Sequence, residues 1–371
     1  MAGCTVTPST ETPVPPDSAA PVFAISPSPT MKPTPAPTPE PTPEPTPAPT
    51  PEPTPEPTVK PEWELIFTGD VLLDDLPGRL MRQHGLTAPI DGSLIDTLAA
   101  ADWVGVNLEA PFSDRGEREP HKDYAYRAPP EHVGLLQRMG VSYCALANNH
   151  TLDYGHEALF DTLDLLRERG VGFSGAGANL EDAKQPARFT LGDTDMAVFS
   201  ACRHMPYMSW YANETRPGLL TTYDPAELLA VLTETEADLK IVFVHWGVEY
   251  ESMPETYQKD LAHRYIDAGA DLVIGSHPHV PQGFEIYQGK LIAYSLGNFI
   301  FPNSRTPTLA LRVILGPDGD QRASVIPCRI AGGATSPLPD AQIAAFYRHL
   351  TDISFEVEVT ADGDIVPHGA G

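Results

Sequence analysis

The sequence predicts an α/β fold in which mixed β-sheets are flanked by helices, preceded by a proline-rich arm. From residue 62 to about residue 283, short apolar runs alternate with stretches of helical periodicity. Beyond that point the helical stretches thin out and short apolar runs follow one another, which indicates antiparallel strands. Proline is concentrated at the start of the chain, since residues 1–61 hold 21 of its 41 prolines.

Residues 1–61 are expected to form a disordered Thr/Pro/Glu-rich arm, and residues 62–371 one α/β domain. From residue 27 to residue 61 the chain repeats Thr-Pro-Ala-Pro and Thr-Pro-Glu-Pro units. Repeated proline favours extended polyproline II, so this segment reaches on the order of 100 Å. We interpret the arm as a spacer, and the alternative is a disordered tail without a role.

The first four residues, Met1-Ala2-Gly3-Cys4, resemble the end of a bacterial lipoprotein signal, in which the cysteine is lipidated. The charged and apolar regions that normally precede such a cysteine are missing. The expectation is an extracytoplasmic protein at the bacterial cell surface, lipid-anchored through Cys4 in its natural precursor. The alternative is a chance cysteine near the terminus.

Charge excludes several classes of function. The arm has a net charge of −4, which leaves −22 of the total of −26 for residues 62–371. Nucleic acid is excluded as a partner because phosphate neutralisation needs a basic face. No run of about 18 apolar residues is present, so membrane contact is expected only through an N-terminal anchor. The four cysteines are scattered along the chain, which argues against a zinc ribbon or a disulfide scaffold.

The elements of the domain follow from the same patterns, in chain order. Apolar runs predict strands at 64–67, 103–108, 141–146, 240–244 and 271–274. Apolar residues at helical spacing predict helices at 93–101, 131–139 and 157–169. Beyond Gly283, strands are expected at 284–287, 291–294, 309–315 and 323–330, with a helix at 340–349.

Five of the predicted strands end in a loop that carries Asp, Glu, Asn or His. Sites in α/β sheets form outside the carboxyl ends of strands, so one shared site is favoured. Mixed oxygen and nitrogen donors suit Mn, Fe or Zn, although each residue alone could be a helix cap, a turn residue or a core residue. In an extended segment 276–280, two histidines would point the same way. The candidate ligands are Asp70, Glu109, Asn149, His245, His277 and His279.

These residues lie in segments that resemble the CapA family of capsule and poly-γ-glutamate synthesis proteins, within the calcineurin-like metallophosphatase superfamily. The resemblance covers about residues 64–301, and its final SHPH and SLGNF motifs are highly specific. It implies a metallophosphatase-like layered sandwich. The matching segments are FTGDVLL at 67–73, NLEAPF at 107–112, YAYRAPPE at 124–131, LANNHTLDYG at 146–155, GAGANLEDAKQPA at 175–187, HWGVEYESMP at 245–254 and GADLVIGSHPHVPQGFEIYQGKLIAYSLGNFIF at 269–301.

The resemblance implies a site for two metal ions. Asp70 and His279 would serve the first ion and Glu109 would bridge, while Asn149, His245 and His277 would serve the second. His150 would be the general acid or a phosphate contact, oriented by Asp153. The chain departs from many metallophosphatases because Val71 and Leu72 follow Asp70, where Asp-x-His would supply another imidazole. The first ion is therefore expected to be held more weakly.

Further residues are expected around this site. Lys122, Tyr124 and Arg127 form a candidate clamp for an anionic substrate, and the alternative is an ordinary solvated loop. Arg203 and His204 stand in an aromatic stretch that could line a cleft, and neither is assigned a role. The residues expected to support the ligands are Asn107, Glu249, Ser295 and Asn298.

Three functions remain open at this point. The first is metal-dependent hydrolysis or transfer in the synthesis or export of poly-γ-glutamate or another capsular polymer. The second is a non-catalytic accessory protein that binds the anionic polymer or a membrane synthase complex. The third is a general phosphoesterase acting on a phosphorylated substrate, which follows from the fold alone.

Overall fold

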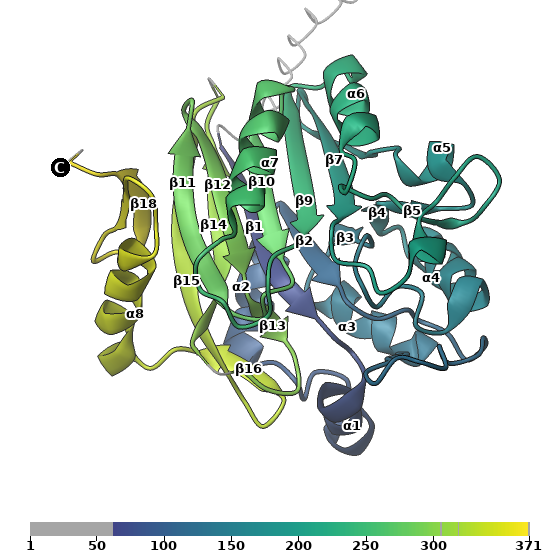
Figure 1. Ribbon diagram of the computed structural model, residues 1–371. Coiled ribbons are helices and arrows are strands. Elements are labelled where there is room, and N and C mark those ends of the chain that lie inside the picture. The colour runs from purple at the N-terminus through teal and green to yellow at the C-terminus, as the bar shows by residue number, and fades with distance from the viewer. Residues whose placement is uncertain (1–61, 305, 318, 370–371) are drawn as a thin grey trace, which may run out of the picture. The chain divides into compact units, whose positions relative to one another are not determined.

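The computed structural model describes residues 62–304, 306–317 and 319–369. The predicted arm at 1–61 and its Cys4 lie outside the described residues. Within the described part, two β-sheets pack face to face and helices cover their outer faces (Figure 1). This arrangement confirms the predicted layered α/β fold with mixed sheets flanked by helices.

The first sheet has a parallel half that carries β1 at its centre. Strands β1 to β4 and β13 pair in parallel, and β14 pairs with β1 in the antiparallel sense. Its strand order is β17 (Val357–Val359), β18 (Asp364–Pro367), β15 (Gln321–Ala331), β14 (Thr308–Leu315), β1 (Trp63–Val71), β2 (Trp103–Leu108), β3 (Tyr143–Ala145) and β4 (Gly172–Ser174), with β13 (Asn298–Ile300) beside β1 and β16 (Ala334–Pro337) beside β15.

The second sheet has a parallel centre and antiparallel edges. Strands β7, β9, β10 and β12 run parallel, while β6 and β11 pair in the antiparallel sense. Its order is β11 (Pro281–Tyr287), β12 (Lys290–Leu296), β10 (Leu272–Ser276), β9 (Leu239–His245), β7 (Thr194–Cys202) and β6 (Ala187–Leu191). A separate pair joins β5 (Ala176–Gly177) to β8 (Gly218–Leu219). The expected antiparallel pairing beyond Gly283 is confirmed at β11–β12 and β14–β15.

The helices pack against the sheets through apolar side chains at helical spacing. One set covers the outer face of the first sheet: α1 (Asp75–His84), α2 (Gly92–Ala100), α3 (Val133–Arg138) and α4 (Gly155–Glu168). The outer face of the second sheet is covered by α6 (Ala226–Glu234) and α7 (Thr256–Asp267). The remaining helices are α5 (Leu180–Ala183), α8 (Asp340–Asp352) and two 3-10 turns, η1 (Pro130–His132) and η2 (Met208–Trp210). None of these helices has both the length and the apolarity of a membrane span.

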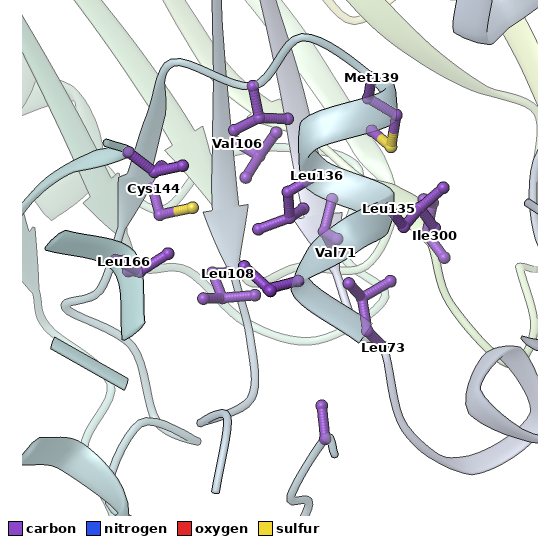
Figure 2. Close-up of a cluster of buried hydrophobic side chains, with 14 of the residues drawn as sticks. Val71, Leu73, Val106, Leu108, Leu135, Leu136, Met139, Cys144, Leu166 and Ile300 are labelled. Atoms are coloured by element: carbon purple, nitrogen blue, oxygen red, sulfur yellow. The ribbon is translucent and has the colours of Figure 1, made fainter. Parts of the chain in front are cut away.

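Three apolar clusters hold the layers together. The cluster between the sheets contains Phe67 and Trp103 from the first sheet and Phe243 from the second. In the cluster outside the first sheet, Leu136 of α3 packs with Val106 of β2 (Figure 2). These fully buried contacts fix β1 and β2 relative to each other, so the polar residues at their carboxyl ends have fixed positions.

The first strand is longer than the sequence predicts. The apolar run 64–67 ends before Thr68, yet β1 continues to Val71 because Asp70 pairs with Asn107 of β2 and with Asn298 of β13. The expectation that Asp70 stands in a loop after the strand is therefore wrong. Asp70 is the last but one residue of β1. Partners distant in sequence complete the strand, and local apolarity gives no sign of them.

Candidate metal centre

The six predicted ligands come from both sheets and gather at one end of the sandwich. They stand at or just after the carboxyl ends of parallel strands, as expected for an α/β site. All six are buried, with at most 7% of any residue exposed. They are Asp70 in β1, Glu109 after β2, Asn149 after β3, His245 at the end of β9, and His277 and His279 after β10.

Asp70, Glu109 and His279 form one compact group. A potential ligand atom of each lies within 4.8 Å of those of the other two. Asp70 Oδ2 lies 3.2 Å from His279 Nδ1. This group of two carboxylates and one imidazole can hold a metal ion.

The remaining predicted ligands adjoin this group through Glu109. His245 Nε2 lies 3.8 Å from Glu109 Oε1 and 2.9 Å from Asn149 Oδ1. The ring of His277 lies beside that of His245, with 4.7 Å between centroids. Glu109 therefore stands between the Asp70 side and the His245 side of the centre.

Several polar atoms of the centre are buried without a hydrogen-bond partner. The part of the chain that the structure describes contains nine such side-chain atoms, and five belong to predicted ligands. They are Asp70 Oδ2, both carboxylate oxygens of Glu109, and both ring nitrogens of His277. Buried polar groups are ordinarily paired, because an unpaired one costs about 1–3 kcal/mol. A cation at the centre would give partners to the carboxylate oxygens and to one ring nitrogen of His277, so the donor set fits a metal.

The electrostatics of the centre agree with this fit. Burial, reinforced by the negative charge of Asp70, raises the pKa of Glu109 well above its usual range. Burial and neighbouring imidazoles lower the pKa values of His245 and His277 well below theirs. Burial opposes protonation of His279 as well, but the charges of Glu109 and Asp70 raise its pKa to about 9. The neutral imidazoles of His245 and His277 can bind a cation as they are, whereas a metal ion would replace protons on Glu109 and His279.

Close backbone approach holds Asp70 in place. The Asp70 N–H donates to the Gly297 carbonyl at 3.0 Å. A Cβ on Gly69 would collide with that same carbonyl oxygen, so only glycine fits there. The Gly-Asp pair of this strand therefore has a structural reason as well as a chemical one.

His277 and His279 do not lie in an extended segment, which corrects the expectation for 276–280. Their φ angles are +98° and +60°, so the chain turns after β10. The Pro278 carbonyl accepts a hydrogen bond from Tyr250 N–H at 2.7 Å, which secures this turn. The two rings still come close, with centroids 5.9 Å apart. Positive φ at bulky residues is a strained conformation that clusters at functional sites.

Two of the four predicted supporting residues contact the ligands directly. Asn107 Nδ2 donates to Asp70 Oδ1 at 2.8 Å, and Asn298 Oδ1 accepts from His279 Nδ1 at 2.8 Å. Ser295 instead bonds backbone groups, donating to the Val280 carbonyl at 2.8 Å. Glu249 is exposed on the rim of the adjoining cleft.

Sequence reasoning missed two residues near the ligands, Asn148 and Ser276, and assigned no role to a third, His204. Asn148 donates to the Leu108 carbonyl at 2.8 Å and accepts from His150 N–H at 3.0 Å, so it ties two ligand loops together. Ser276 Oγ lies 3.0 Å from His245 Nδ1. His204 stacks on His277, with 4.1 Å between centroids. The first two adjoin predicted ligands in sequence, which is the signal that could have found them.

His150 turns its Nε2 toward the centre, and its Nδ1 contacts residues on the side away from the centre. Its Nδ1 lies 2.7 Å from Asp153 Oδ2, and its Nε2 lies 4.0 Å from Glu109 Oε1. The Lys122 ammonium forms an ion pair with Asp153 and donates to the Asn149 carbonyl. Burial lowers the pKa values of both His150 and Lys122. The Nδ1 of His150 thus faces both Asp153 and Lys122, whose Nζ lies 2.9 Å from it, and Nε2 is turned toward the ligands.

The predicted anion clamp is dispersed. Lys122 is occupied by Asp153, as described above. Tyr124 stands on the cleft rim and is 70% exposed. Arg127 turns away, because its guanidinium donates to the Arg115 carbonyl at 2.8 Å and lies over the Tyr154 ring. The structure therefore does not bring these three side chains to one point.

Comparison with known proteins supports the resemblance. The family described as bacterial capsule synthesis protein PGA_cap matches residues 64–303. The PGA biosynthesis protein CapA of Bacillus subtilis is 31% identical over 287 residues, covering 73% of each chain. The capsule biosynthesis protein CapA of Bacillus anthracis is 30% identical over 308 residues, covering 77% of this chain and 72% of that protein. A probable polyglutamine synthesis accessory protein of Mycobacterium tuberculosis is 36% identical over 212 residues, covering 54% and 56%. The chain belongs to the PGA_cap family of bacterial capsule synthesis proteins.

Proposed function

We propose that the protein takes part in the synthesis or export of an anionic capsular polymer of the poly-γ-glutamate type, using a dinuclear metal centre for hydrolysis or transfer. Family membership supports the capsular role. The observation that carries the metal centre is the set of five buried, unpartnered donor atoms on Asp70, Glu109 and His277. No other feature of the described chain concentrates so many unpaired polar atoms in one place.

In this proposal the ligands divide between two ions. Asp70 and His279 hold the first, Glu109 bridges, and the second is held by Asn149, His245 and His277. The donors suit Mn, Fe or Zn. When bound, such ions supply Lewis-acid activation of a phosphoryl or acyl group.

His150 is the proposed proton-transfer residue. In this proposal Nδ1–H donates to Asp153, so the lone pair of Nε2 faces the Glu109 side of the centre. A neutral imidazole in this orientation accepts a proton at Nε2 and returns it to a leaving group. Lys122 forms an ion pair with Asp153 and so places a cation beside the carboxylate that orients the ring.

The proposed place of work is the outside of the bacterial cell. Cys4 would carry a lipid and the arm at 1–61 would hold the domain away from the membrane. A membrane synthase complex is the proposed partner. The basis for these statements is the Cys4 motif, the proline repeats and the capsule biosynthesis relatives.

A non-catalytic accessory role is the second candidate. The mycobacterial relative is named an accessory protein, and in this chain the cation nearest to His150 is already paired with Asp153. Under this alternative the metal centre would bind the polymer or stabilise the fold, and no bond would be broken.

Metal analysis followed by turnover tests the proposal. We expect the full chain to bind Mn²⁺, Fe²⁺ or Zn²⁺, and His277→Ala with His279→Ala to abolish that binding. His84→Ala with His156→Ala, two exposed histidines outside the centre, is the matched control. Unchanged metal binding in the first double variant would contradict the site.

Turnover then separates the two candidates. We would assay p-nitrophenyl phosphate esters and poly-γ-glutamate with added Mn²⁺. Hydrolysis that His150→Ala abolishes would support the catalytic role. Polymer binding without hydrolysis of any substrate would favour the accessory role.

A further inference from the structure

A cleft of about 510 Å³ opens in front of the metal centre. His150 and His279 belong both to its lining and to the centre, so a ligand in the cleft reaches the centre directly. Among the residues that the structure describes, the rest of the lining is mainly aromatic and acidic and includes no lysine or arginine. The aromatic residues are Tyr124, Tyr126, Tyr250 and Phe301, and the acidic ones are Asp75 and Glu249.

Several cations around the cleft are already engaged. Arg79 is paired with Asp75 of the lining. Lys122 is paired with Asp153, and Arg127 is bound to the Arg115 and Gly116 carbonyls of its own loop. Arg203 donates to the Thr222 carbonyl at 2.8 Å and lies over the Tyr223 and Tyr257 rings. None of these cations offers a free charge to a carboxylate-rich chain in the cleft. A polyanion lying along the cleft would meet the exposed Glu249, which repels it, while the charge of Asp75 is partly offset by Arg79 at 3.4 Å.

The same walls suit a positively charged group. Aromatic faces attract ammonium groups, and carboxylates at the rim add Coulombic attraction. Burial raises the pKa of the Tyr126 phenol, and the charge of the nearby Asp75 adds to this rise. Asp75 is held at φ +47° and Tyr250 at φ +67°. Strained backbone at both acidic and aromatic walls indicates that their positions are functionally constrained.

We infer that the cleft binds the primary ammonium group at the amino terminus of a glutamyl chain, placing the end of the polymer and not its interior at the metal centre. This inference rests on the proposed function, because it names the part of the polymer that the same site takes. An interior stretch of a γ-linked chain presents carboxylates alone. At the amino terminus, one ammonium group stands beside a carboxylate that the metal centre would accept.

Calorimetric titration with two peptides tests the inference. The full chain, loaded with Mn²⁺, is titrated with a γ-glutamyl pentapeptide whose amino terminus is free, and with its N-acetylated form. We expect roughly tenfold tighter binding of the free form, the product of one exposed ion pair and one cation–π contact. Equal affinity, or tighter binding of the acetylated peptide, would overturn the inference.

Variants test whether the preference for the free amino terminus over the acetylated one arises in the cleft. Glu249→Gln is expected to reduce it to about threefold, because one carboxylate is lost. Glu251→Gln, an exposed glutamate two residues further along and outside the lining, is expected to keep it. Tyr124→Leu should weaken the preference and Tyr223→Leu should not, since both tyrosines are more than half exposed but only Tyr124 lines the cleft. A full preference in both Glu249→Gln and Tyr124→Leu would refute the assignment.

The outcomes distinguish this inference from the proposed function. If both peptides bind equally, end recognition fails while polymer binding at the metal centre stands. If neither binds although Mn²⁺ is retained, end recognition and the glutamyl polymer as ligand fail together.

Discussion

Glu109→Gln should change stability in opposite directions with and without metal. In the metal-free protein Glu109 is fully buried, its two oxygens lack partners, and burial with the charge of Asp70 raises its pKa. The folded protein must therefore keep this carboxyl protonated or leave a charge unpaired. Glutamine has nearly the same shape and no charge, so the metal-free variant should be more stable than the parent protein.

The size of this effect is bounded by proton linkage. The ordinary pKa of the group is 4.5, and keeping it protonated at pH 7 costs at most about 3.4 kcal/mol at 1.36 kcal/mol per pH unit. For about 310 residues the unfolding entropy is about 650 cal/mol/K, so the upper limit is a melting temperature about 5 °C higher. Since the folded pKa exceeds the unfolded one, the cost is absent below pH 4.5. It then grows as the pH rises.

Bound metal should make the parent protein more stable than the Glu109→Gln variant. Ions at 1,000 times their Kd stabilise the parent protein by about 4.1 kcal/mol, or about 6 °C, which exceeds the upper limit of about 3.4 kcal/mol, while the variant without its bridging carboxylate should gain much less. Thermal unfolding by circular dichroism, between pH 4.5 and 7, with EDTA and then with Mn²⁺, measures both effects. Glu236→Gln, an exposed glutamate, is the matched control and should behave as the parent protein.

Two results would refute this reasoning. The first is a Glu109→Gln protein that is less stable than the parent protein in EDTA at pH 7, since no buried charge would then have been relieved. The second is an equal response of both proteins to Mn²⁺, which would place the ion elsewhere.

Three further predictions follow from the site and its frame. Gly69→Ala should lower the free energy of unfolding in urea by more than about 3 kcal/mol, because the new Cβ would meet a backbone carbonyl oxygen. Gly92→Ala, which has open space at its Cβ, should be neutral or slightly stabilising. Equal stabilities of the two variants would contradict the close approach at Gly69. Asn298→Ala should weaken Mn²⁺ affinity roughly 10–100-fold by calorimetry, since the amide that orients a ligand imidazole is lost, and unchanged affinity would refute that role. If the protein is a hydrolase, Asp153→Asn should lower kcat about 10²–10⁴-fold and move its pH profile, while the exposed Asp164→Asn should do neither.

Much of the site was predictable because its signals are local. Asp70, Glu109, Asn149 and His245 follow apolar runs that form parallel strands, and such strands present their carboxyl ends on one side of a sheet. The family motifs include the same positions. Each of these signals needs only a few consecutive residues, so a single sequence displays it.

Contacts between distant segments were not predictable in the same way. Lys122 pairs with Asp153 across 31 positions, and this pairing removes it from the expected clamp. The sequence predicts that Arg127 binds an anion, yet the carbonyl groups of Arg115 and Gly116, 12 and 11 positions earlier in the same folded loop, occupy its guanidinium. Charge and residue type are written in the sequence, whereas the partner that each charge finds depends on how the loops pack.

The sequence by itself therefore determined the α/β class, the chain order of the strands and helices that it predicted and which residue types meet at the centre, but it did not predict β7 or the helices α1, α6 and α7. Tertiary structure alone decided that β1 extends through Asp70, because β13 lies more than 220 positions further on. It also decided that the cleft is aromatic and acidic, since its lining comes from several loops that lie far apart along the chain. Apolar periodicity is a property of neighbouring residues, but hydrogen-bond partners and cleft charge arise only when remote segments are packed together.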